Sequence, residues 1–463
     1  MSGITAALNT GISALRTHQA AIGVTSQNIA NVNTPGYQRQ RVNFREMSGP
    51  SGYKNPPVIG TGVNAKSIIR FATPFIDEQL RRQRGISGDA ALTEDLLRDI
   101  ESVLTEPSGT GINAGLDNLW KAWQNLSVLP VEEATRVALV QSANQLTASI
   151  KEAHSFIQNL HENMPSQIST KVQRINDIAT EIADLNQQII QANARNGGPG
   201  GAIPLEQRRD GLLFELSDVV DFRLITEESG LARVAIGNNA LVDDSGARAV
   251  QLNPEGVPVW AANGRPLTIA SGQLNALLHM KNEGIPRVLD QLNGLAVGLR
   301  DKVNEIHRTG FGIDGSTGLD FFVGEDAATL GVNPVLTATP AKIASGGIPN
   351  SIGDISVALQ IAGLATQPVM GGDPPTTTIN GFFRSAITNL GLRIRHTEAN
   401  NTASEMVFNH LTDRRESISG VSMDEEVANL LSYEKAFQAG ARIINAVDEM
   451  LDQVINRMGL VGR

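Results

Sequence analysis

The sequence contains no cysteine among its 463 residues. This absence excludes a disulfide framework and any metal site built from thiolates. Aromatic residues are also scarce, at 4% of the chain. Long apolar runs are missing too, and without about 18 consecutive apolar residues we expect no segment that inserts into a membrane. The remaining pattern, rich in Ala, Leu, Ile and Val, is typical of helices that pack on helices.

Positive charge is in the minority, with 38 Lys and Arg against 48 Asp and Glu and a formal net charge of -10. The densest basic cluster is Arg81, Arg82 and Arg84, which we interpret as a solvated helix end. Because no basic stripe is available to neutralise phosphates, we expect no nucleic-acid partner. The stretch Met1–Leu15 has no charged side chain, so a cleaved secretory signal with its basic start is not expected either.

Residues that carry chemistry are sparse and scattered. His154 and His161 are seven residues apart, about 10 Å along a helix and too far to share one metal ion. Gly310–Gly315 matches a G-x-G-x-x-G pattern but follows a helical pattern and not a strand, so the dinucleotide context is missing. We therefore predict no enzyme, no catalytic or metal-binding residues and no cofactor.

One alternative of another class is a hydrolase associated with protein export. It would need a catalytic cluster within 201–374, where the histidines are His279 and His307 and no nucleophile is paired with them. That absence disfavours the alternative.

Two apolar stripes with a seven-residue step mark the two ends of the chain. The first consists of Leu8, Leu15, Ile22 and Ile29. The second consists of Leu430, Phe437, Ile444, Leu451 and Met458. Such a repeat is typical of a helix that packs against another helix in a coiled coil. We therefore predict two long terminal helices and assign these residues to an assembly interface.

Local signals predict where the terminal helices begin and end. Thr34-Pro35-Gly36 should stop the first helix near Asn33. Ser422 followed by Glu425 fits a capping box, in which the hydroxyl and the carboxylate satisfy backbone N–H groups at the start of the second helix.

The middle of the chain changes from helix to β and back. Helical spacing covers 131–163 and 166–196, and Pro165 between them predicts a tight turn joining two antiparallel helices. After the glycine-rich linker 197–201, short β runs separated by hairpin signals extend from 223 to 242. Helical patterns resume at Gln273 and continue, with an irregular stretch at 319–374, to Ser419.

The predicted fold is therefore mainly α with a smaller β module. We expect terminal helices that form a coiled coil, a long helical-bundle rod domain and an antiparallel β outer domain. Because the chain leaves the helical part and returns to it, the domains should be nested. The predicted division is 1–43 with 420–463 for the core domain, 44–200 with 272–312 and 347–419 for the rod domain, and 201–271 with 313–346 for the outer domain.

The end of the first helix carries a recognisable pattern. It reads Ser26-Gln27-Asn28-Ile29-Ala30-Asn31-Val32-Asn33-Thr34-Pro35-Gly36-Tyr37. This stretch resembles the N-terminal signature of the bacterial flagellar axial proteins, the rod, hook and hook-associated family. The motif positions are Ser26, Asn28, Ala30, Asn31, Thr34, Pro35, Gly36 and Tyr37. Gly60–Val63, 205–220 and 419–426 are similar to further blocks of the family, the last two to its hook-associated members.

The resemblance implies a structural subunit of the flagellum that joins hook to filament after type III export, and so an extracellular location. It also implies partners, namely further copies of the chain in a helical ring, the hook protein, a second junction protein with the filament, and an export chaperone on the C-terminal helix. Another axial subunit, such as a hook or distal rod protein, remains the alternative because the N-terminal signature is shared.

Overall fold

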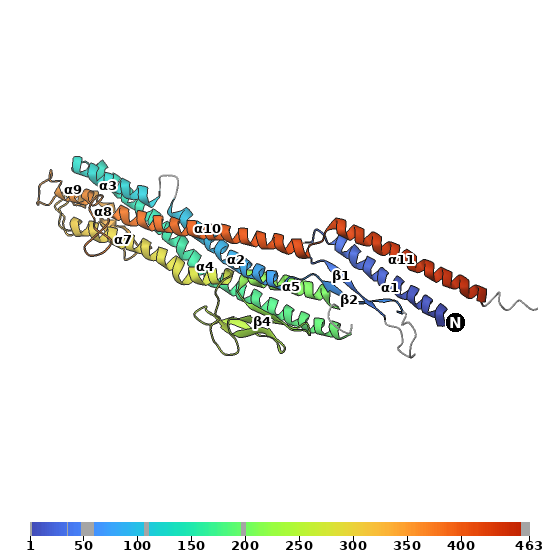
Figure 1. Cartoon of the computed structure of the whole chain (residues 1–463). Helices are drawn as coiled ribbons and strands as arrows, with labels where there is room; N and C mark the ends of the chain where they lie inside the picture. Colours follow the sequence, from blue (N-terminus) through green and yellow to red (C-terminus); the bar gives the residue numbers. More distant parts are fainter. Residues whose placement is uncertain (1, 35, 48–59, 106–110, 196–200, 455–463) are drawn as a thin grey trace, which may run out of the picture.

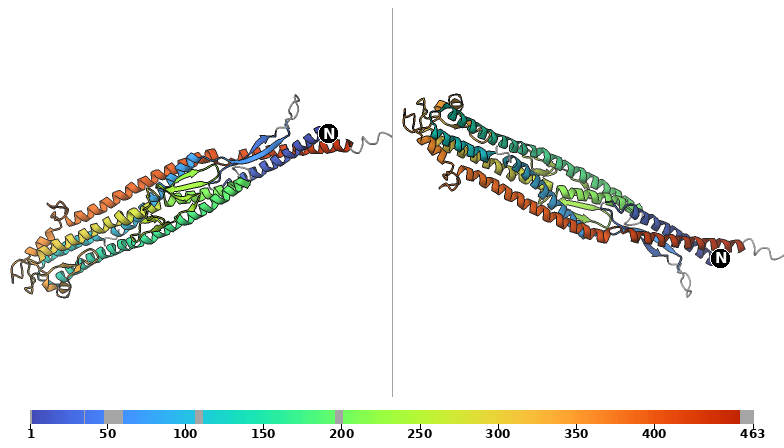
Figure 2. Two further views of the ribbon diagram at one scale, coloured as in Figure 1. Left: turned by 90° about the horizontal axis from the view of Figure 1, so that it is seen from below. Right: turned by 90° about the horizontal axis from the view of Figure 1, so that it is seen from above.

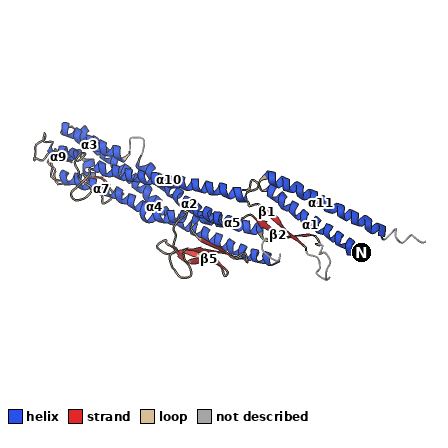
Figure 3. Cartoon of the chain, viewed as in Figure 1, coloured by secondary structure: helices blue, strands red, loops and turns tan. Residues whose placement is uncertain are grey.

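The computed structural model describes residues 2–34, 36–47, 60–105, 111–195 and 201–454. It shows an elongated bundle of helices, with the first helix α1 and the last helix α11 side by side at one end (Figure 1). The fold is mainly α with smaller antiparallel β elements, which confirms the predicted fold class (Figure 3).

The rod is built from helices that share one apolar core. They are α2 (Pro74–Leu104), α3 (Ile112–Val128), α4 (Glu133–Arg195), α5 (Ile203–Val219), α6 (Gln273–His279), α7 (Ile285–His307) and α10 (Ile379–Ser419), with a π-helical turn at Met280–Gly284. Trp123 on α3, Leu139 on α4 and Leu295 on α7 are all fully buried in this core. One large hydrophobic cluster therefore runs along most of the rod, and a second, small cluster of Ile76, Leu80 and Leu411 lies between α2 and α10.

Helix α4 corrects the prediction of a turn at Pro165. The helix continues through this proline without a break. Pro165 itself is exposed, whereas Met164 and Ile168 beside it are buried. Burial of the apolar stripe on both sides offsets the cost of about 3 kcal/mol that proline imposes inside a helix.

The β module lies on the flank of α4 (Figures 1 and 2). Its four-stranded antiparallel sheet has the order β3 (Arg223–Thr226), β4 (Ala232–Ile236), β5 (Asn239–Asp243) and β6 (Gly246–Ala247). A second ribbon pairs β7 (Val250–Leu252) with β8 (Pro258–Trp260). The predicted hairpins thus form, and the sequence reasoning missed only the shorter strands.

Two asparagines of α4 fix this module to the rod. Asn186 Nδ2 donates to Ala232 O at 2.8 Å, and Asn186 Oδ1 accepts from Ala232 N–H at 3.1 Å. Asn176 pairs in the same way with Val250, with both distances 2.8 Å. Each side-chain amide thus satisfies a backbone N–H and a backbone C=O that would otherwise need a neighbouring strand as their partner.

Residues 313–346 lie at the far end of the rod and not in the β module. They contain β9 (Phe322–Val323), β10 (Gly331–Val332), α8 (Pro334–Ala338) and a 3-10 turn at Pro340–Lys342, and α9 (Ser356–Gly363) follows. β9 and β10 pair with each other, and no described strand joins them to β3–β8. The two segments that the sequence placed together in one outer domain therefore belong to different sheets.

His307 and Arg136 hold this end together. His307 Nδ1 donates to Leu319 O at 2.7 Å, and Nε2 accepts from Ala344 N–H at 3.0 Å. Burial lowers the pKa of His307 to about 4, so the imidazole is neutral and both bonds fit one tautomer. Arg136 is fully buried and donates to Pro130 O and to Ile343 O, the latter at 2.6 Å.

The terminal unit consists of α1 (Ser2–Ala30), α11 (Met423–Asp452) and the ribbon of β1 (Gln40–Glu46) with β2 (Val63–Arg70). The ribbon packs on α1, with Val42 buried against Ala21 and Val24. This unit has its own small apolar cluster, which also includes Phe44, Ala65, Ile68 and Tyr433.

Candidate functional site

The paired helices α1 and α11 approach closely at two glycines. A Cβ atom added to Gly11 would lie 2.9 Å from Ile444 Cγ1, and one added to Gly440 would lie 3.3 Å from Leu15 Cδ2. Contacts under 3.0 Å require a neighbour to move. The absence of side chains at these two positions therefore lets the helices pack along each other.

The residues predicted for the assembly interface lie partly within this intramolecular contact. Leu8, Leu15, Ile22 and Ile29 on α1 are all half-buried, as are Leu430, Phe437, Ile444 and Leu451 on α11. Met458 lies outside the described residues. The eight described residues thus retain some exposed surface, and their role between subunits stays a prediction.

Two exposed apolar sets on α11 were not predicted from the sequence. Five large side chains on this helix are more than 40% exposed, namely Met423, Val427, Leu431, Ile443 and Met450. The spacing is visible in the sequence, because 423, 427 and 431 are four residues apart and 443 and 450 are seven residues apart. At 3.6 residues per turn, the two sets lie on opposite sides of the helix. The longer seven-residue stripe of Leu430 and Phe437 dominated the pattern and hid the two shorter sets.

Asn28 of the family motif is the centre of a buried polar network. Its Nδ2 donates to Gln40 O at 2.8 Å and to Glu426 Oε2 at 2.9 Å. Its Oδ1 accepts from Gln40 N–H at 3.0 Å and from the Tyr37 hydroxyl at 2.9 Å. One fully buried side chain thereby joins α1, the start of β1 and α11.

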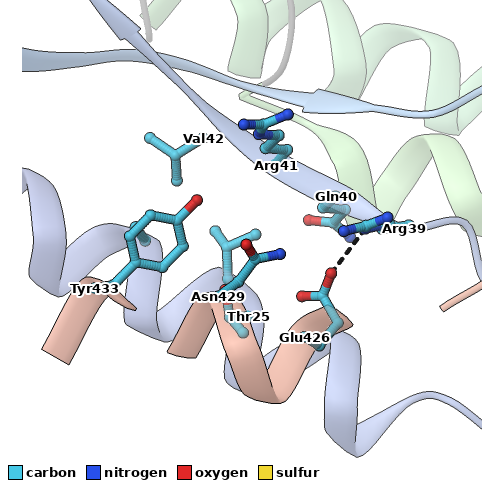
Figure 4. Close-up of a pocket in the computed structure, with 10 residues that line it drawn as sticks. Thr25, Arg39, Gln40, Arg41, Val42, Glu426, Asn429 and Tyr433 are labelled. Atoms are coloured by element: carbon cyan, nitrogen blue, oxygen red, sulfur yellow. Dashed lines mark ion pairs between the residues drawn. The ribbon is translucent and has the colours of Figure 1, made fainter. Parts of the chain in front are cut away.

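Glu426 supplies the charge in this network (Figure 4). Its Oε1 pairs with Arg39 Nε at 2.7 Å, and its side chain is 3% exposed. Glu425 pairs with Arg39 Nη1 at 2.6 Å. A buried carboxylate is tolerated here because a guanidinium and an amide satisfy it.

This arrangement corrects the capping-box prediction. Ser422 is indeed the N-cap of α11, but its side chain makes no capping hydrogen bond. Glu425 is directed toward Arg39 instead of back to the helix start. An ion pair between distant segments thus replaces the local cap.

Tyr37 is kept protonated by its surroundings. Burial, together with the negative charge of Glu426, raises the pKa of Tyr37 to about 12. The phenol therefore donates to Asn28 at every physiological pH. The motif residues Asn28 and Tyr37, separated by nine positions, act as a pair.

The other motif residues have different surroundings. Ser26, Ala30 and Thr34 are exposed, and Asn31 is half-buried and donates to Gln27 O at 2.9 Å. Gly36 has a φ of +78°, a conformation that favours glycine. Pro35 lies outside the described residues.

The network encloses little space. The cavity beside it, lined by Val24, Gln40, Val42 and Tyr433 among others, has a volume of about 10 Å³ (Figure 4). Such a volume admits one water molecule at most. Among the described residues, no group of three or more His, Asp or Glu side chains is placed to hold a metal ion, and none of the described helices meets the length and apolarity needed to cross a membrane.

The fold and the terminal unit define a class of protein. Residues 8–38 match the family model of the flagella basal body rod protein, and residues 415–458 match that of the flagellar basal body rod FlgEFG protein C-terminal. Residues 97–322 match the flagellar hook-associated protein FlgK helical domain. The chain belongs to the bacterial flagellar axial protein family.

Within this family the chain is similar to flagellar hook-associated protein 1. It is 27% identical to that protein of Bacillus subtilis (strain 168), over 98% of this chain and 99% of the relative. It is 22% identical to the protein of the same name from Salmonella typhimurium, over 97% of this chain and 99% of that relative. The fold resembles that of the flagellar hook junction protein FlgK from Burkholderia pseudomallei, with a TM-score of 0.62 over 74% of this chain and all of that one, at 14% identity.

Proposed function

We propose that this chain is a structural subunit of the bacterial flagellum that joins the hook to the filament outside the cell. Its similarity to flagellar hook-associated protein 1 over nearly its whole length supports this role. The proposed role is mechanical and needs no catalytic site.

The observation that carries the proposal is the incomplete burial of α11. Only three of its 30 residues are buried, whereas α4 buries 21 of 63. The five exposed apolar side chains of α11 form two surfaces on opposite sides of the helix that water disfavours. Neighbouring subunits in a tube would cover such a surface.

The finer part of the proposal concerns partners. Further copies of the chain would pack through α1 and α11 in a helical ring, between the hook protein on one side and a second junction protein with the filament on the other. An export chaperone would cover α11 before type III export. In this proposal 1–43 with 420–463 is the inner domain of the tube.

The test is complementation of a strain that lacks the gene. Without the protein, electron microscopy should show hooks that end without filaments. Leu431→Asp should fail to restore filaments, because it places a charge on an exposed apolar surface of α11. Ile225→Asp is the matched control, since Leu431 and Ile225 are 54% and 55% exposed and Ile225 lies on the β module.

Filaments restored equally by both variants would contradict the assembly role of α11. Normal filaments in the deletion strain would contradict the junction role itself. Ile444→Asp is a poorer test than Leu431→Asp, because Ile444 contacts Gly11 within the chain and a charge there would also disturb the folded monomer.

A further inference from the structure

The terminal unit and the rod meet at a contact that we call the joint (Figure 1). Two short connections cross it, 71–73 between β2 and α2 and 420–422 between α10 and α11. Each connection is three residues long, so the relative position of the two units depends on the contacts between them.

No apolar core crosses the joint among the described residues. The cluster of the terminal unit contains Ala21, Val24 and Val42, and the nearest rod cluster contains Ile76, Leu80 and Leu411. The two clusters share no residue. An interface without a common apolar core gives little resistance to relative motion of its two sides.

Polar contacts hold the joint instead. Arg415 of α10 donates from Nη2 to Gly36 O at 2.9 Å and pairs through Nε with Asp77 of α2 at 3.1 Å. Gln38 Nε2 donates to the same Asp77 at 3.4 Å. The Asp77 carboxylate and the Arg415 guanidinium thus connect the motif turn to two rod helices.

An ion pair also crosses the joint. Arg70 at the end of β2 pairs with Asp210 of α5 at 2.5 Å and with Glu206 at 3.7 Å. The side chains of Arg70 and Asp210 are 16% and 38% exposed, and those of Arg415 and Asp77 are 22% and 19% exposed. Salt therefore reaches both pairs in part and weakens them.

One backbone hydrogen bond completes the set. Arg39 N–H donates to Ser419 O at 2.9 Å, at the last residue of α10. This bond is close to the 420–422 connection, so it can act as a pivot while the side-chain contacts across the joint open.

We propose that the joint is an ionic hinge, in which the Arg70–Asp210 ion pair and the hydrogen bond from the Arg415 guanidinium to Gly36 O set the angle between the terminal unit and the rod, while Asp77 of the rod holds Arg415 in place. The angle is fixed when both of these contacts across the joint are closed and varies when they open. A subunit could then tilt its terminal helices relative to its rod without unfolding either unit. The proposal concerns the free chain and does not depend on the role at the hook–filament junction.

The lack of cysteine makes the hinge directly measurable. Ala403 on α10 and Ala439 on α11 are both exposed, and each lies about 24 Å along its helix from the joint. Spin labels on Ala403→Cys and Ala439→Cys report the distance across the joint by pulsed electron resonance in the otherwise unaltered full-length chain. A label pair on Ala403→Cys and Gln188→Cys, both exposed and both in the rod, is the control.

We expect one narrow distance distribution across the joint at low salt. It should broaden or shift by several ångströms in 1 M NaCl and in the Arg70→Gln, Arg415→Gln double variant, whereas the rod distance stays unchanged. Arg174→Gln should leave both distances unchanged, since it removes an exposed pair with Glu215 away from the joint.

Two results would overturn the hinge. The first is a joint distance that remains narrow and unshifted in both the double variant and 1 M NaCl. The second is an equal broadening of the rod distance, which would show that the substitutions loosen the rod and not the joint.

Discussion

Helices α4 and α1 carry the same seven-residue apolar step but differ in burial. On α4 the step consists of Ile168, Ile175, Ile182 and Ile189, which are all 0% exposed. On α1 it consists of Leu8, Leu15, Ile22 and Ile29, which are all only half-buried. The pattern therefore predicts that a helix needs a partner, but not whether its own chain supplies the whole of that partner.

The difference follows from what each helix packs against. Helix α4 contacts helices α3, α5, α6 and α7 and the β module. Among the described elements, helix α1 packs mainly against α11 and the β1–β2 ribbon. Apolar burial contributes about 25 cal/mol per Å². The rod has a large buried apolar core and is stabilised mainly by it. The terminal unit has only a small apolar cluster and depends more on its polar network.

The largest expected effect is on the rod. Ile182→Ala should lower the free energy of unfolding by about 3–4 kcal/mol, because it removes a fully buried side chain and leaves a cavity. Ile22→Ala should lower the stability of the terminal unit by only about 1 kcal/mol, because that side chain is only partly buried.

The tryptophans allow the two units to be followed separately. Trp120 and Trp123 lie on α3 and Trp260 lies on β8, so their fluorescence in a denaturant titration reports the rod and the β module fixed to it. Hydrogen exchange of α1 amides reports the terminal unit. Equal losses of stability for Ile182→Ala and Ile22→Ala would contradict the proposed difference in burial between α4 and α1.

Acid should lower the stability of the rod, and alkali should lower the stability of the terminal unit. The pKa of His307 is lowered to about 4 in the folded chain from 6.5, so its contribution is complete above pH 6.5 and is lost as the pH falls toward 4. The loss reaches about 3 kcal/mol. The pKa of Tyr37 is raised from 10.0 to about 12, so its contribution is complete below pH 10 and is lost as the pH rises through 12.

Stability measured against pH checks both directions. Tryptophan fluorescence should show the acid loss, and His307→Gln should remove most of its pH dependence between 6.5 and 4. Circular dichroism above pH 10 should show the alkaline loss, and Tyr37→Phe should reduce it. If the acid transition is unchanged in His307→Gln, groups other than His307 cause it.

The sequence predicted the helices better than it predicted what joins them. The seven-residue steps and the motif marked α1 and α11 correctly, and helical spacing marked the second half of α4, because periodicity is a local property. The role of Asn28 was hidden, since its partner Glu426 is 398 positions away. The predictions at Pro165 and Ser422 were wrong because of distant contacts too. At Pro165, tertiary packing overrode the local turn signal. At Ser422, the expected capping residue Glu425 pairs with the distant Arg39 instead.

The polar network of the terminal unit should show the next largest effect. Glu426→Gln should destabilise α11 by about 2 kcal/mol, because Arg39 and Asn28 lose a buried charged partner. Hydrogen exchange in the first turns of α11 should accelerate, while tryptophan fluorescence of the rod stays unchanged. Glu425→Gln is the matched control, since Glu425 pairs with the same arginine but its side chain is 62% exposed, against 3% for Glu426. Equal effects of the two would mean that burial of Glu426 does not strengthen its pairing.

The smallest expected effect comes from a surface ion pair of the rod. Arg174 donates from Nε and Nη2 to both oxygens of Glu215, at 2.6 and 2.7 Å, yet the two side chains are 41% and 46% exposed. Because water screens an exposed pair of this kind, Arg174→Gln should change the free energy of unfolding by no more than about 0.5 kcal/mol. A denaturant titration followed by tryptophan fluorescence measures this change directly. A loss as large as that for Glu426→Gln would show that short geometry alone, and not burial, decides the strength of ion pairs in this protein, and the division between an apolar rod and a polar terminal unit would then lose its basis.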